Sequence, residues 1–513
     1  MVEQLAAPRP AEASGGHART AEGPRTRDGF ILLVGLIGIL FVWLRPLGSS
    51  LWLDETGTFW VLQGSLGDVV HRALDFQGQF PLYHVALWGW SRIAGTSEIA
   101  LRLPSLAGAL LAAWLCGRLA LRLFGDAALA AVAACVFVLL PPVAFAAADA
   151  RPYALALAAL LGATLTLLRW LRSERPRDGL LYVGLTALTL SLHYLFVLAL
   201  VSHVVLSLGT IRRLGRRGVL AALAAVVGVV LLLAPTIPHF VEVLGRRDAM
   251  SLFTYGSVRE LLAWLAPPAV VLAFLAGRFA TVPDEPLPPG VDLPPERRWF
   301  LLAWLVVPPL ALYLFGLVSG VGLFAERHFL SSVPALALLG AAAFAILGPR
   351  RRRIAVLVLA ILFVLGTSSP FHARSDWRGA ARAADAVSSG PGTPILVYTG
   401  FSESRQMAWI LDPERSQLFL APLAAYPVTG RTSPLPFSLT DRARDYVEGI
   451  LAASAGADRI VLITSESTRT YDTWLAERAG ALGFTGREIG EYGDVRVVLF
   501  ERREGASDDL PGR

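Results

Sequence analysis

The sequence predicts an α-helical polytopic membrane protein with a small α/β domain at its C-terminal end. Hydrophobic residues make up 54% of its 513 residues and charged residues only 17%, whereas soluble domains carry about a quarter of charged residues. The apolar residues gather between positions 29 and 369, in blocks of roughly 17–25 residues, the length of a helix that spans a bilayer. Beyond position 369 the composition is that of a soluble domain.

The choice of basic residues and the small number of cysteines exclude several kinds of chemistry. All 46 basic residues are Arg, because the chain contains no Lys; Schiff-base chemistry is thereby excluded, and phosphate must be held by Arg, His or backbone N–H groups. Cys116 and Cys135 both lie in apolar runs, so neither a disulfide framework nor a Cys-based zinc site is expected. The net charge of +6 is that of Arg-bearing loops beside a lipid bilayer, and no nucleic-acid partner is expected.

The N-terminal residues divide into a tail and a first span. Residues 1–28 are rich in Ala, Gly, Pro and Arg without an apolar period, which predicts a disordered cytoplasmic tail. The first apolar run, 29–44, has no small-x-small cleavage site before Trp52. It therefore predicts an uncleaved membrane anchor.

Ten further apolar segments bring the expected number of transmembrane helices to about eleven, in one domain over residues 29–369. They lie at 99–123, 127–147, 152–171, 180–193, 195–208, 219–238, 258–275, 299–318, 329–347 and 354–367. The fifth and sixth helices could merge at His193-Tyr194, and Pro267-Pro268 interrupt the eighth.

The positive-inside rule orients these helices. With the N-terminus in the cytoplasm, the cytoplasmic loops all contain Arg, as the rule requires; they are 169–177, 212–217, 278–298 and 350–353. The loops on the other side carry few Arg, with Arg246-Arg247 as the exception. An odd number of spans places the C-terminus outside. The sequence thus predicts a multi-pass plasma-membrane protein whose C-terminal domain is extracytoplasmic.

Two outer segments are too long to be turns. The first outer loop, 48–98, runs from Gln79-Phe80-Pro81 into a stretch with Trp88 and Trp90, which predicts a helix lying in the membrane interface. The second segment, 370–513, predicts an α/β domain. Its strand-like stretches are 394–398, 459–464 and 495–501, and its helix-like stretches are 377–387, 441–454 and 471–482. Walker A, GxGxxG, HExxH and GxSxG patterns do not occur in the sequence.

Ionisable residues within the membrane domain gather at the predicted outer ends of the spans. They are Asp54, Glu55, Asp149, Arg151, His193, His239, Arg327 and His328. A transporter would place such groups near the bilayer midplane, whereas an enzyme that acts on a lipid headgroup would place them at one interface. The distribution favours an enzyme. A glycolipid transporter or flippase and a non-catalytic membrane scaffold are the alternatives.

Three carboxylates are the candidate catalytic residues. Asp54 is a candidate general base for an acceptor hydroxyl or the N-cap of a helix that begins at Thr56. Glu55 would tune that base or help to hold a divalent cation. Alternatively, it is a first-turn Glu that the dipole of that helix favours. Asp149 is a second acid facing Asp54 or the cap of a helix that begins near Pro152. The sequence identifies no further metal ligands, since the spacing of the His residues matches no zinc pattern.

The candidate substrate-binding residues are mostly cationic or aromatic. They are Gln79, Tyr83, Arg151, Tyr153, His193, Arg327 and His328. Arg151 would grip phosphate or extend towards lipid headgroups. Arg327 with His328 would neutralise a departing phosphate, or Arg327 would form a surface pair with Glu326.

Residues 29–345 resemble GT-C glycosyltransferases that use polyprenyl-phosphate-linked sugars, which include the protein O-mannosyltransferases, the lipid A aminoarabinose transferase and the rhizobial lipopolysaccharide glycosyltransferases. The resemblance rests on five segments: Asp54-Glu55, Gln79-Phe80-Pro81-Leu82-Tyr83, Arg102-Leu103-Pro104-Ser105, Asp149-Ala150-Arg151-Pro152-Tyr153, and Arg327-His328-Phe329-Leu330 with Pro334. Many of these relatives carry Lys-Pro-Pro where this chain has Gln79-Phe80-Pro81, so Arg151 or Arg327 would have to supply that charge. The segment 375–381 is similar to the extracytoplasmic tails of bacterial members.

The resemblance implies an inverting hexosyl- or pentosyltransferase. The donor would be a polyprenyl-phosphate-linked sugar, and the acceptor a cell-envelope glycan, lipid or protein hydroxyl at the outer face of the membrane. Asp54 takes the place of the base, and Asp149 that of the acid in the second outer loop. The leaving polyprenyl phosphate is weakly basic, so cationic stabilisation is sufficient for its departure.

Overall fold

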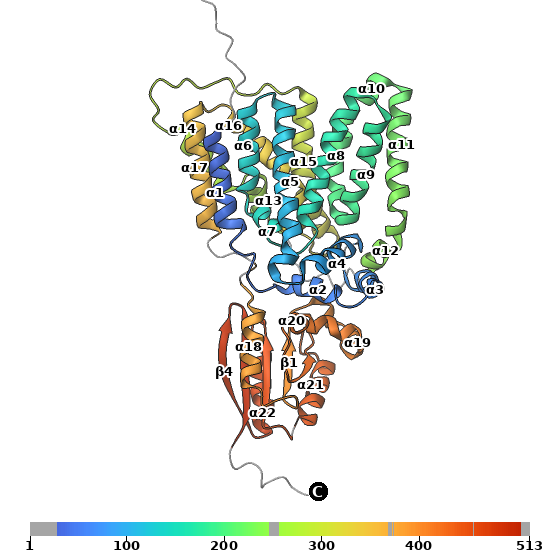
Figure 1. The fold of residues 1–513 in the computed structure, drawn as a ribbon, viewed down its shortest axis with the longest axis vertical. Coiled ribbons are helices and arrows are strands. Elements are labelled where there is room, and N and C mark those ends of the chain that lie inside the picture. The colour runs from blue at the N-terminus through green and yellow to red at the C-terminus, as the bar shows by residue number, and fades with distance from the viewer. Residues whose placement is uncertain are drawn as a thin grey trace, which may run out of the picture.

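The computed structural model describes residues 28–78, 80–245, 256–367, 372, 374–454 and 456–503. A bundle of long helices occupies one end of the molecule, an α/β domain occupies the other, and a layer of short helices lies between them (Figure 1). The predicted fold class, a helical membrane protein with a C-terminal sheet region, is confirmed.

The long helices run roughly parallel to one another (Figure 1). They are α1 (Gly29–Gly38, continued by the π-helical turn Ile39–Trp43), α5 (Glu98–Phe124), α6 (Ala127–Val138), α8 (Tyr153–Ser173), α9 (Pro176–Leu192), α10 (Leu200–Leu214), α11 (Arg216–Leu233), α14 (Pro268–Phe279), α15 (Pro295–Ser319), α16 (Val333–Phe344) and α17 (Pro349–Gly366). Their outward side chains are largely apolar, as on the exposed face of α11, which suits contact with lipid.

Within the described residues, five helices are long and apolar enough to cross a membrane, or seven if each of two bent pairs is one span. One pair bends by 70° between α6 and α7 (Pro141–Ala147), and the other by 46° between α13 (Val258–Leu265) and α14. Both bends lie at a Pro-Pro pair, which removes two backbone donors from the helical ladder. The interruption expected at Pro267-Pro268 is therefore present. The total of eleven spans stays a prediction.

The short helices lie at the end of the bundle that faces the α/β domain (Figure 1). They are α2 (Leu53–Val61), α3 (Leu66–Phe76), α4 (Leu82–Ala94), α7, α12 (Ile237–Gly245) and α13. Helix α2 begins after Trp52, so Asp54 lies inside its first turn and is not the N-cap. Pro152 occupies the N-cap position of α8, so Asp149 does not cap that helix. The capping alternatives for both acids are thereby removed.

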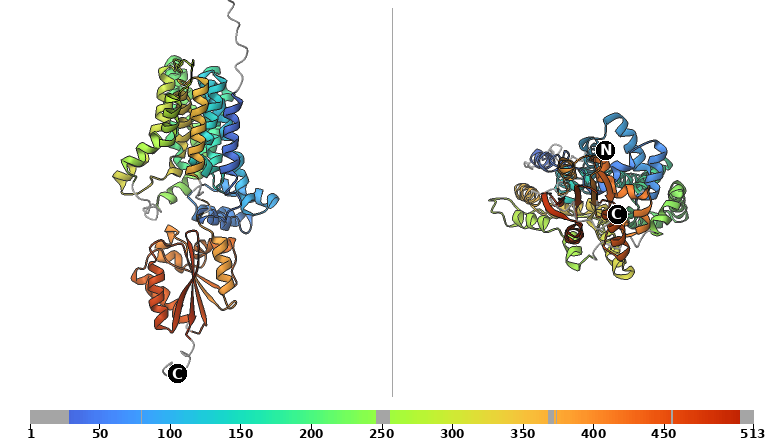
Figure 2. Two further views of the ribbon diagram at one scale, coloured as in Figure 1. Left: turned by 90° about the vertical axis from the view of Figure 1, so that its left-hand side faces the viewer. Right: turned by 90° about the horizontal axis from the view of Figure 1, so that it is seen from below.

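The C-terminal domain contains a five-stranded sheet in the order β2-β1-β3-β5-β4. Strands β2 (Arg431–Pro434), β1 (Pro394–Tyr398) and β3 (Arg459–Thr464) are parallel, and β5 (Val495–Arg502) and β4 (Phe484–Tyr492) are added antiparallel. Helices lie on both faces of the sheet (Figure 2). Helix α18 (Trp377–Val387) packs on one face, and α21 (Asp441–Ala453) and α22 (Thr470–Ala481) pack on the other.

Contacts between the two domains fix the sheet against the short helices. The Arg378 guanidinium lies 3.0 Å from Glu98 at the start of α5, and the Tyr426 hydroxyl donates to the same carboxylate at 3.0 Å. Phe76 of α3 packs edge-on against Trp409, with ring centroids 5.7 Å apart. Polar and apolar contacts thus both hold the α/β domain against the short helices.

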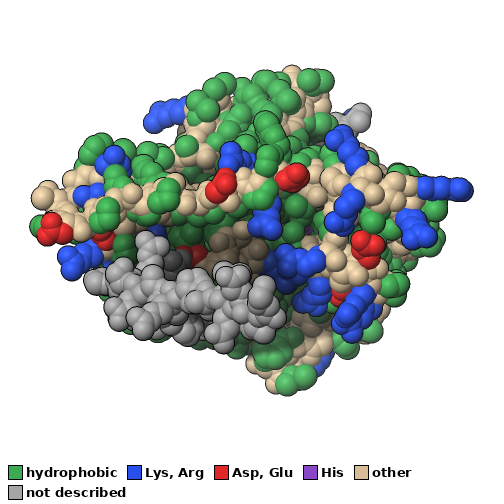
Figure 3. All heavy atoms as spheres, turned by 90° about the horizontal axis from the view of Figure 1, so that it is seen from above, with side chains coloured by type: hydrophobic (Ala, Val, Ile, Leu, Met, Phe, Trp, Pro, Cys, Tyr) green, Lys and Arg blue, Asp and Glu red, His purple; other side chains and the backbone are tan. Residues whose placement is uncertain are grey.

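The opposite end of the bundle carries the Arg residues of the loops that were assigned to the cytoplasm. The last turns of α5, α8 and α10 contain Arg122, Arg172 and Arg212-Arg213, and the first turn of α17 contains Arg350. Figure 3 looks onto this end and shows many Arg side chains among the apolar ones. The Arg residues of these predicted cytoplasmic loops therefore lie together at one end of the bundle, and the orientation of that end stays a prediction.

Candidate functional site

Glu55 lies at the centre of a buried network below the bundle. Arg102 of α5 donates from Nε to Glu55 Oε1 at 2.8 Å and from Nη2 to Oε2, and both side chains are fully buried. The backbone N–H of Ala150 also donates to Oε1, at 2.8 Å, and that of Trp52 donates to Oε2, at 3.2 Å. The remaining N–H groups of Arg102 are satisfied by the carbonyls of the loop that precedes α2, which are those of Pro46, Leu47, Ser49 and Ser50.

This network makes Glu55 a positioning residue. Its carboxylate joins the start of α2, the loop between α7 and α8, and helix α5. Each of its oxygens already accepts two hydrogen bonds. A carboxylate paired in this way with a buried guanidinium has both oxygens engaged and is closed off from a substrate. The arrangement therefore gives Glu55 the task of holding Asp54 and Asp149 in place.

Asp54 differs from its neighbour in being accessible. Its side chain is 25% exposed, whereas the side chains of Glu55 and Asp149 are fully buried. Asp54 Oδ2 lies 3.4 Å from Nη1 of Arg327, which comes from the loop between α15 and α16. This distance is longer than that of a typical N–H···O hydrogen bond. Asp54 is therefore the one acid of the three that an acceptor hydroxyl can reach.

Asp149 lies buried behind Trp52. Its Oδ1 accepts a hydrogen bond from the Trp52 indole at 3.0 Å and lies 3.6 Å from Nε2 of His372. Oδ2 has no hydrogen-bond partner within the part of the chain that the structure describes. Burial raises the pKa of the Asp149 carboxyl, and hydrogen bonding to His372 opposes this shift. His372 itself stacks on Phe145, with ring centroids 4.7 Å apart.

Arg151 forms the second cationic centre of the site. It donates from Nη1 to Gln77 at 3.0 Å and to Thr58, one turn after Asp54, at 3.4 Å. The ring of Tyr153 lies 5.3 Å from that of His193, which closes the site on the bundle side. Tyr83 of α4 is buried, and burial raises the pKa of its hydroxyl. The predicted residue Gln79 lies outside the described residues.

The predicted site residues thus form one cluster in two layers. Asp54 and Arg327 form the accessible layer, whereas Glu55, Asp149 and Arg151 lie behind it. Sequence reasoning missed several members of the second layer, namely Trp52, Gln77, Arg102 and His372. Arg102 could have been found, because a charge inside an apolar helix requires a partner. His372 gave no signal, since it follows the last predicted span in a loop.

The tautomer and charge of His328 follow from its surroundings. Its Nδ1 lies 2.8 Å from the carbonyl oxygen of Leu323, so Nδ1 must carry the proton and Nε2 is left as an acceptor. Burial, with a smaller contribution from the neighbouring Arg327, lowers the pKa of His328 to about 4. The ring is therefore neutral at neutral pH, and Arg327 supplies the positive charge that was expected from the pair.

The neutral state of His328 predicts a loss of stability in acid. The ring in the unfolded chain takes up its proton near pH 6.5, whereas the ring in the folded chain does so only near pH 4. The unfolded state binds more protons between these values, so stability must fall as the pH falls through this window. We expect the melting temperature of the detergent-solubilised protein to fall less steeply there in His328→Gln than in the wild type. Parallel curves for the two proteins would contradict a buried neutral ring.

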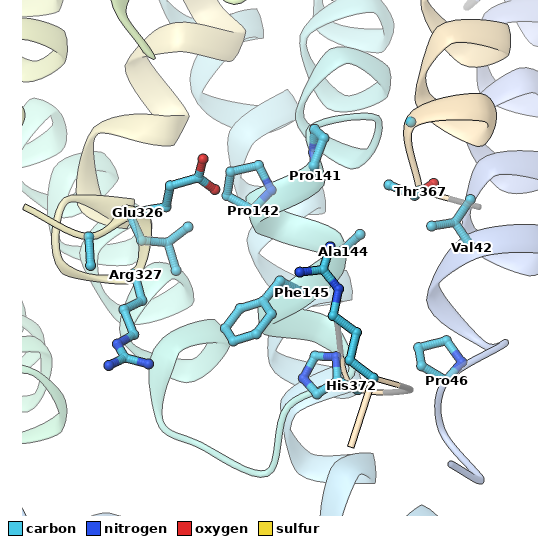
Figure 4. Close-up of a pocket in the computed structure, with 14 residues that line it drawn as sticks. Val42, Pro46, Pro141, Pro142, Ala144, Phe145, Glu326, Arg327, Thr367 and His372 are labelled. Carbon is cyan, nitrogen blue, oxygen red and sulfur yellow. The ribbon is translucent and has the colours of Figure 1, made fainter. Parts of the chain in front are cut away.

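A cavity of about 570 Å³ opens beside Arg327. Arg327, Phe145 and His372 lie along its lower side in Figure 4, and Pro141 and Pro142 lie above them. The cavity shares Pro141, Pro142, Ala325 and Glu326 with a second cavity of about 440 Å³ that extends between α7, α13 and α16. That second cavity is lined mainly by apolar side chains such as Trp264, Phe329 and Leu336. Together they form a path from a cationic end to an apolar one.

The only group of possible metal ligands within the described residues is Glu55, Asp149 and His372, which offer atoms within 4.8 Å of one another. A cation bound there would have to displace Arg102 from Glu55, whose oxygens each already accept two hydrogen bonds. The guanidinium would also repel the ion at short range. These residues therefore do not fit a divalent-cation site.

The comparisons with known proteins concern the fold. Neither a scan against protein-family models nor a search of curated proteins gives a match. Among solved structures, the chain is similar to ArnT from Cupriavidus metallidurans in the apo state, with a TM-score of 0.55 and 14% identity over 92% of this chain and 98% of ArnT. It is also similar to the same protein bound to undecaprenyl phosphate, with a TM-score of 0.53 and 13% identity over the same shares. The chain therefore shares the fold of ArnT, as the resemblance implied.

Proposed function

We propose that this protein is an inverting glycosyltransferase that moves a sugar from a polyprenyl-phosphate donor to a hydroxyl of a cell-envelope acceptor. The observation that carries the proposal is the Asp54–Arg327 pair, 3.4 Å apart, at the cationic end of a cavity that continues into an apolar one. A carboxylate, a guanidinium and an apolar channel are what a lipid-phosphate-linked sugar and an incoming alcohol require. The ArnT structure with bound undecaprenyl phosphate supports a donor of this class.

The donor would lie along the two connected cavities. Its phosphate would lie beside Arg327, with Arg374 also lining this part of the cavity. Its prenyl chain would follow the apolar lining past Pro141 and Pro142 towards Trp264. Apolar chain burial contributes about 0.8 kcal/mol per CH₂ group, so this part of the path would supply most of the affinity for the donor.

The reaction follows from the two accessible groups. The acceptor oxygen attacks the anomeric carbon of the sugar while Asp54 takes the hydroxyl proton. The bond between the anomeric carbon and the phosphate oxygen breaks on the opposite face, and the polyprenyl phosphate leaves with both bonding electrons. Arg327 stabilises the charge on the departing phosphate. When the phosphate draws Arg327 away, the Asp54 carboxylate is freed to accept the proton.

The proposed orientation places this chemistry at the outer face of the plasma membrane. Residues 29–369 would form the catalytic membrane domain, residues 1–28 a cytoplasmic tail and residues 370–513 an extracytoplasmic domain. The Arg-bearing end of the bundle, opposite the site, supports this orientation. Asp149 would act by holding Trp52 and His372 rather than by touching the substrate.

The test is transfer by the purified full-length protein in lipid nanodiscs, with a radiolabelled polyprenyl-phosphate sugar and an envelope extract as acceptor. We expect Arg327→Gln to lower kcat by about 10²–10³-fold, the effect of removing one donor to a developing anion. Arg353→Gln, at an exposed guanidinium on the Arg-bearing end of the bundle, is the matched control and should keep wild-type activity. Absence of label transfer by the wild-type protein, or unchanged turnover by Arg327→Gln, would refute the proposal.

A further inference from the structure

A separate cavity of about 470 Å³ lies in the α/β domain, at the C-terminal ends of strands β1 and β3. Its lining comes from the loops that follow these two strands and from the loop that precedes α21, and it includes Tyr398, Gly400, Phe437, Ser465, Glu466 and Tyr471. Gly400 has φ of +79°, a conformation that favours glycine and turns the chain sharply away after β1. The turn leaves the strand ends open.

The position of this crevice in the sheet is the one where α/β domains bind ligands. From β1 the chain continues to β2 on one side, whereas from β3 it continues through α22 to β4 on the other side. The connections therefore diverge between two neighbouring parallel strands, which creates a gap at their C-terminal ends. Topology alone thus predicts a binding crevice at this point.

The lining of the crevice suits a polyhydroxylated ligand. The rings of Tyr398 and Tyr471 lie 5.3 Å apart and are held in place because their hydroxyls donate to the carbonyls of Phe437 and Pro436. Ser465, Ser467, Thr468 and Thr470 add hydroxyls to the lining. The carboxylate of Glu466 accepts from the hydroxyl of Thr468 at 2.7 Å and from the backbone N–H of Tyr471 at 2.8 Å. Tyr398 and Tyr471 are buried and form the floor, whereas the ring of Phe437 is partly exposed in the lining. An aromatic face attracts the C–H groups of a sugar ring, and hydroxyl side chains both donate hydrogen bonds to its hydroxyls and accept from them.

The charges at the crevice favour a neutral ligand. Within the described lining, Glu466 is the one acidic side chain and no Arg is present, and a carboxylate repels phosphate and other anions. Arg405 borders the crevice with its guanidinium 5.0 Å from the ring of Phe437. A neutral saccharide therefore suits the crevice better than a phosphorylated headgroup does.

The crevice faces the membrane domain. The parallel strands point towards the short helices (Figure 1), so their C-terminal ends lie on that side of the domain. Phe401, three residues after β1, packs against Gly57 of α2, with its ring 3.6 Å from the place where a Cβ would lie. Gly57 is one turn after Asp54 on the same helix. The loop that leaves the crevice therefore contacts the helix that carries the base.

We propose that this crevice binds the saccharide chain of the acceptor and presents its terminal hydroxyl towards Asp54. The inference rests on the proposed function, because it assigns a binding place for the second substrate of that reaction. It names the acceptor class as a neutral glycan, which the catalytic cluster by itself leaves open. The α/β domain would thus act as the acceptor-binding domain of the enzyme.

The test separates acceptor binding from catalysis. Ser467→Trp places a large side chain in the lining at an exposed loop position, where it fills the crevice without touching the core. Glu466→Gln removes the charge and keeps the size of the side chain. We expect each variant to raise the acceptor KM by about tenfold or more, the effect of losing a hydrogen bond to a charged group, with the donor KM and kcat unchanged. Glu448→Gln, in an exposed pair with Arg478 on the helical face, is the matched control.

A binding measurement keeps the crevice testable apart from the reaction. Full-length protein in nanodiscs is probed by saturation-transfer NMR with size-fractionated neutral oligosaccharides released from the cell envelope. We expect signals for the wild type and for Asp54→Asn, and their loss in Ser467→Trp. Three results would overturn the inference. They are oligosaccharide binding that survives Ser467→Trp, no oligosaccharide binding by the wild type, and binding of Ser/Thr-containing peptides in place of oligosaccharides. Loss of transfer in Asp54→Asn would support the base role of Asp54, and oligosaccharide binding kept in the same variant would support the crevice.

Discussion

Asp54→Asn is expected to lower sugar transfer by about 10²–10⁴-fold, the contribution of a positioned general base. The substitution keeps the size of the side chain and removes its ability to accept a proton. Its hydrogen-bonded ion pair with Arg327, at 3.4 Å, is long and partly exposed, with side chains 25% and 23% exposed. The fold should therefore tolerate the change, and the loss should appear in kcat rather than in the yield of folded protein.

The measurement is transfer of radiolabelled sugar at saturating donor, with size-exclusion chromatography to confirm a monodisperse protein. Asp75→Asn is the matched control, because Asp75 is an exposed carboxylate on α3 that forms a surface pair with His71. It should keep full activity. Equal activity in Asp54→Asn and the wild type would show that another group takes the proton, and Asp149 would then be the next residue to test.

The contrast between Asp54 and Glu55 shows what the sequence could not predict. Adjacent residues on a helix point about 100° apart, so α2 directs Asp54 towards Arg327, which lines the cavity, and Glu55 to the protein interior. The sequence indicated that both acids belong to a site, since they follow a membrane span. Which of them faces the substrate depends on Arg102 and on the start of α2, and no local pattern reveals either.

Long-range contacts explain the other differences. Asp54 and Arg327 are 273 residues apart, and their pairing depends on how α16, which follows Arg327, packs against α6 and α15 within the bundle. Strands β1, β3 and β5 were predictable because they are buried and strongly apolar. Strands β2 and β4 were missed because both lie at the edges of the sheet and lack the continuous burial of β1 and β3. The apolar spans were predictable because bilayer thickness fixes their length.

The largest effect on stability is expected from breaking the pair of Glu55 and Arg102. Glu55→Ala leaves the guanidinium of Arg102 buried without its counter-ion. Removal of one partner from a buried ion pair costs about 3–5 kcal/mol, which is a large part of a total stability of about 5–15 kcal/mol. Since the same carboxylate holds Trp52 and Ala150, the loop between α7 and α8 should separate from the start of α2 in this variant. We expect a low yield of monodisperse protein and a large fall in melting temperature.

A double substitution distinguishes this explanation from a catalytic role for Glu55. Glu55→Leu with Arg102→Leu removes both charges, so no unpaired ion remains, and replacement of a buried pair by apolar residues is often neutral for stability. Its melting temperature should lie above that of Glu55→Ala, although the carbonyls that Arg102 satisfied lose their donor. Arg353→Ala, which breaks a partly exposed pair with Asp28, should change stability by at most about 1 kcal/mol. A Glu55→Ala protein that melts like the wild type but transfers no sugar would instead place Glu55 in the reaction itself.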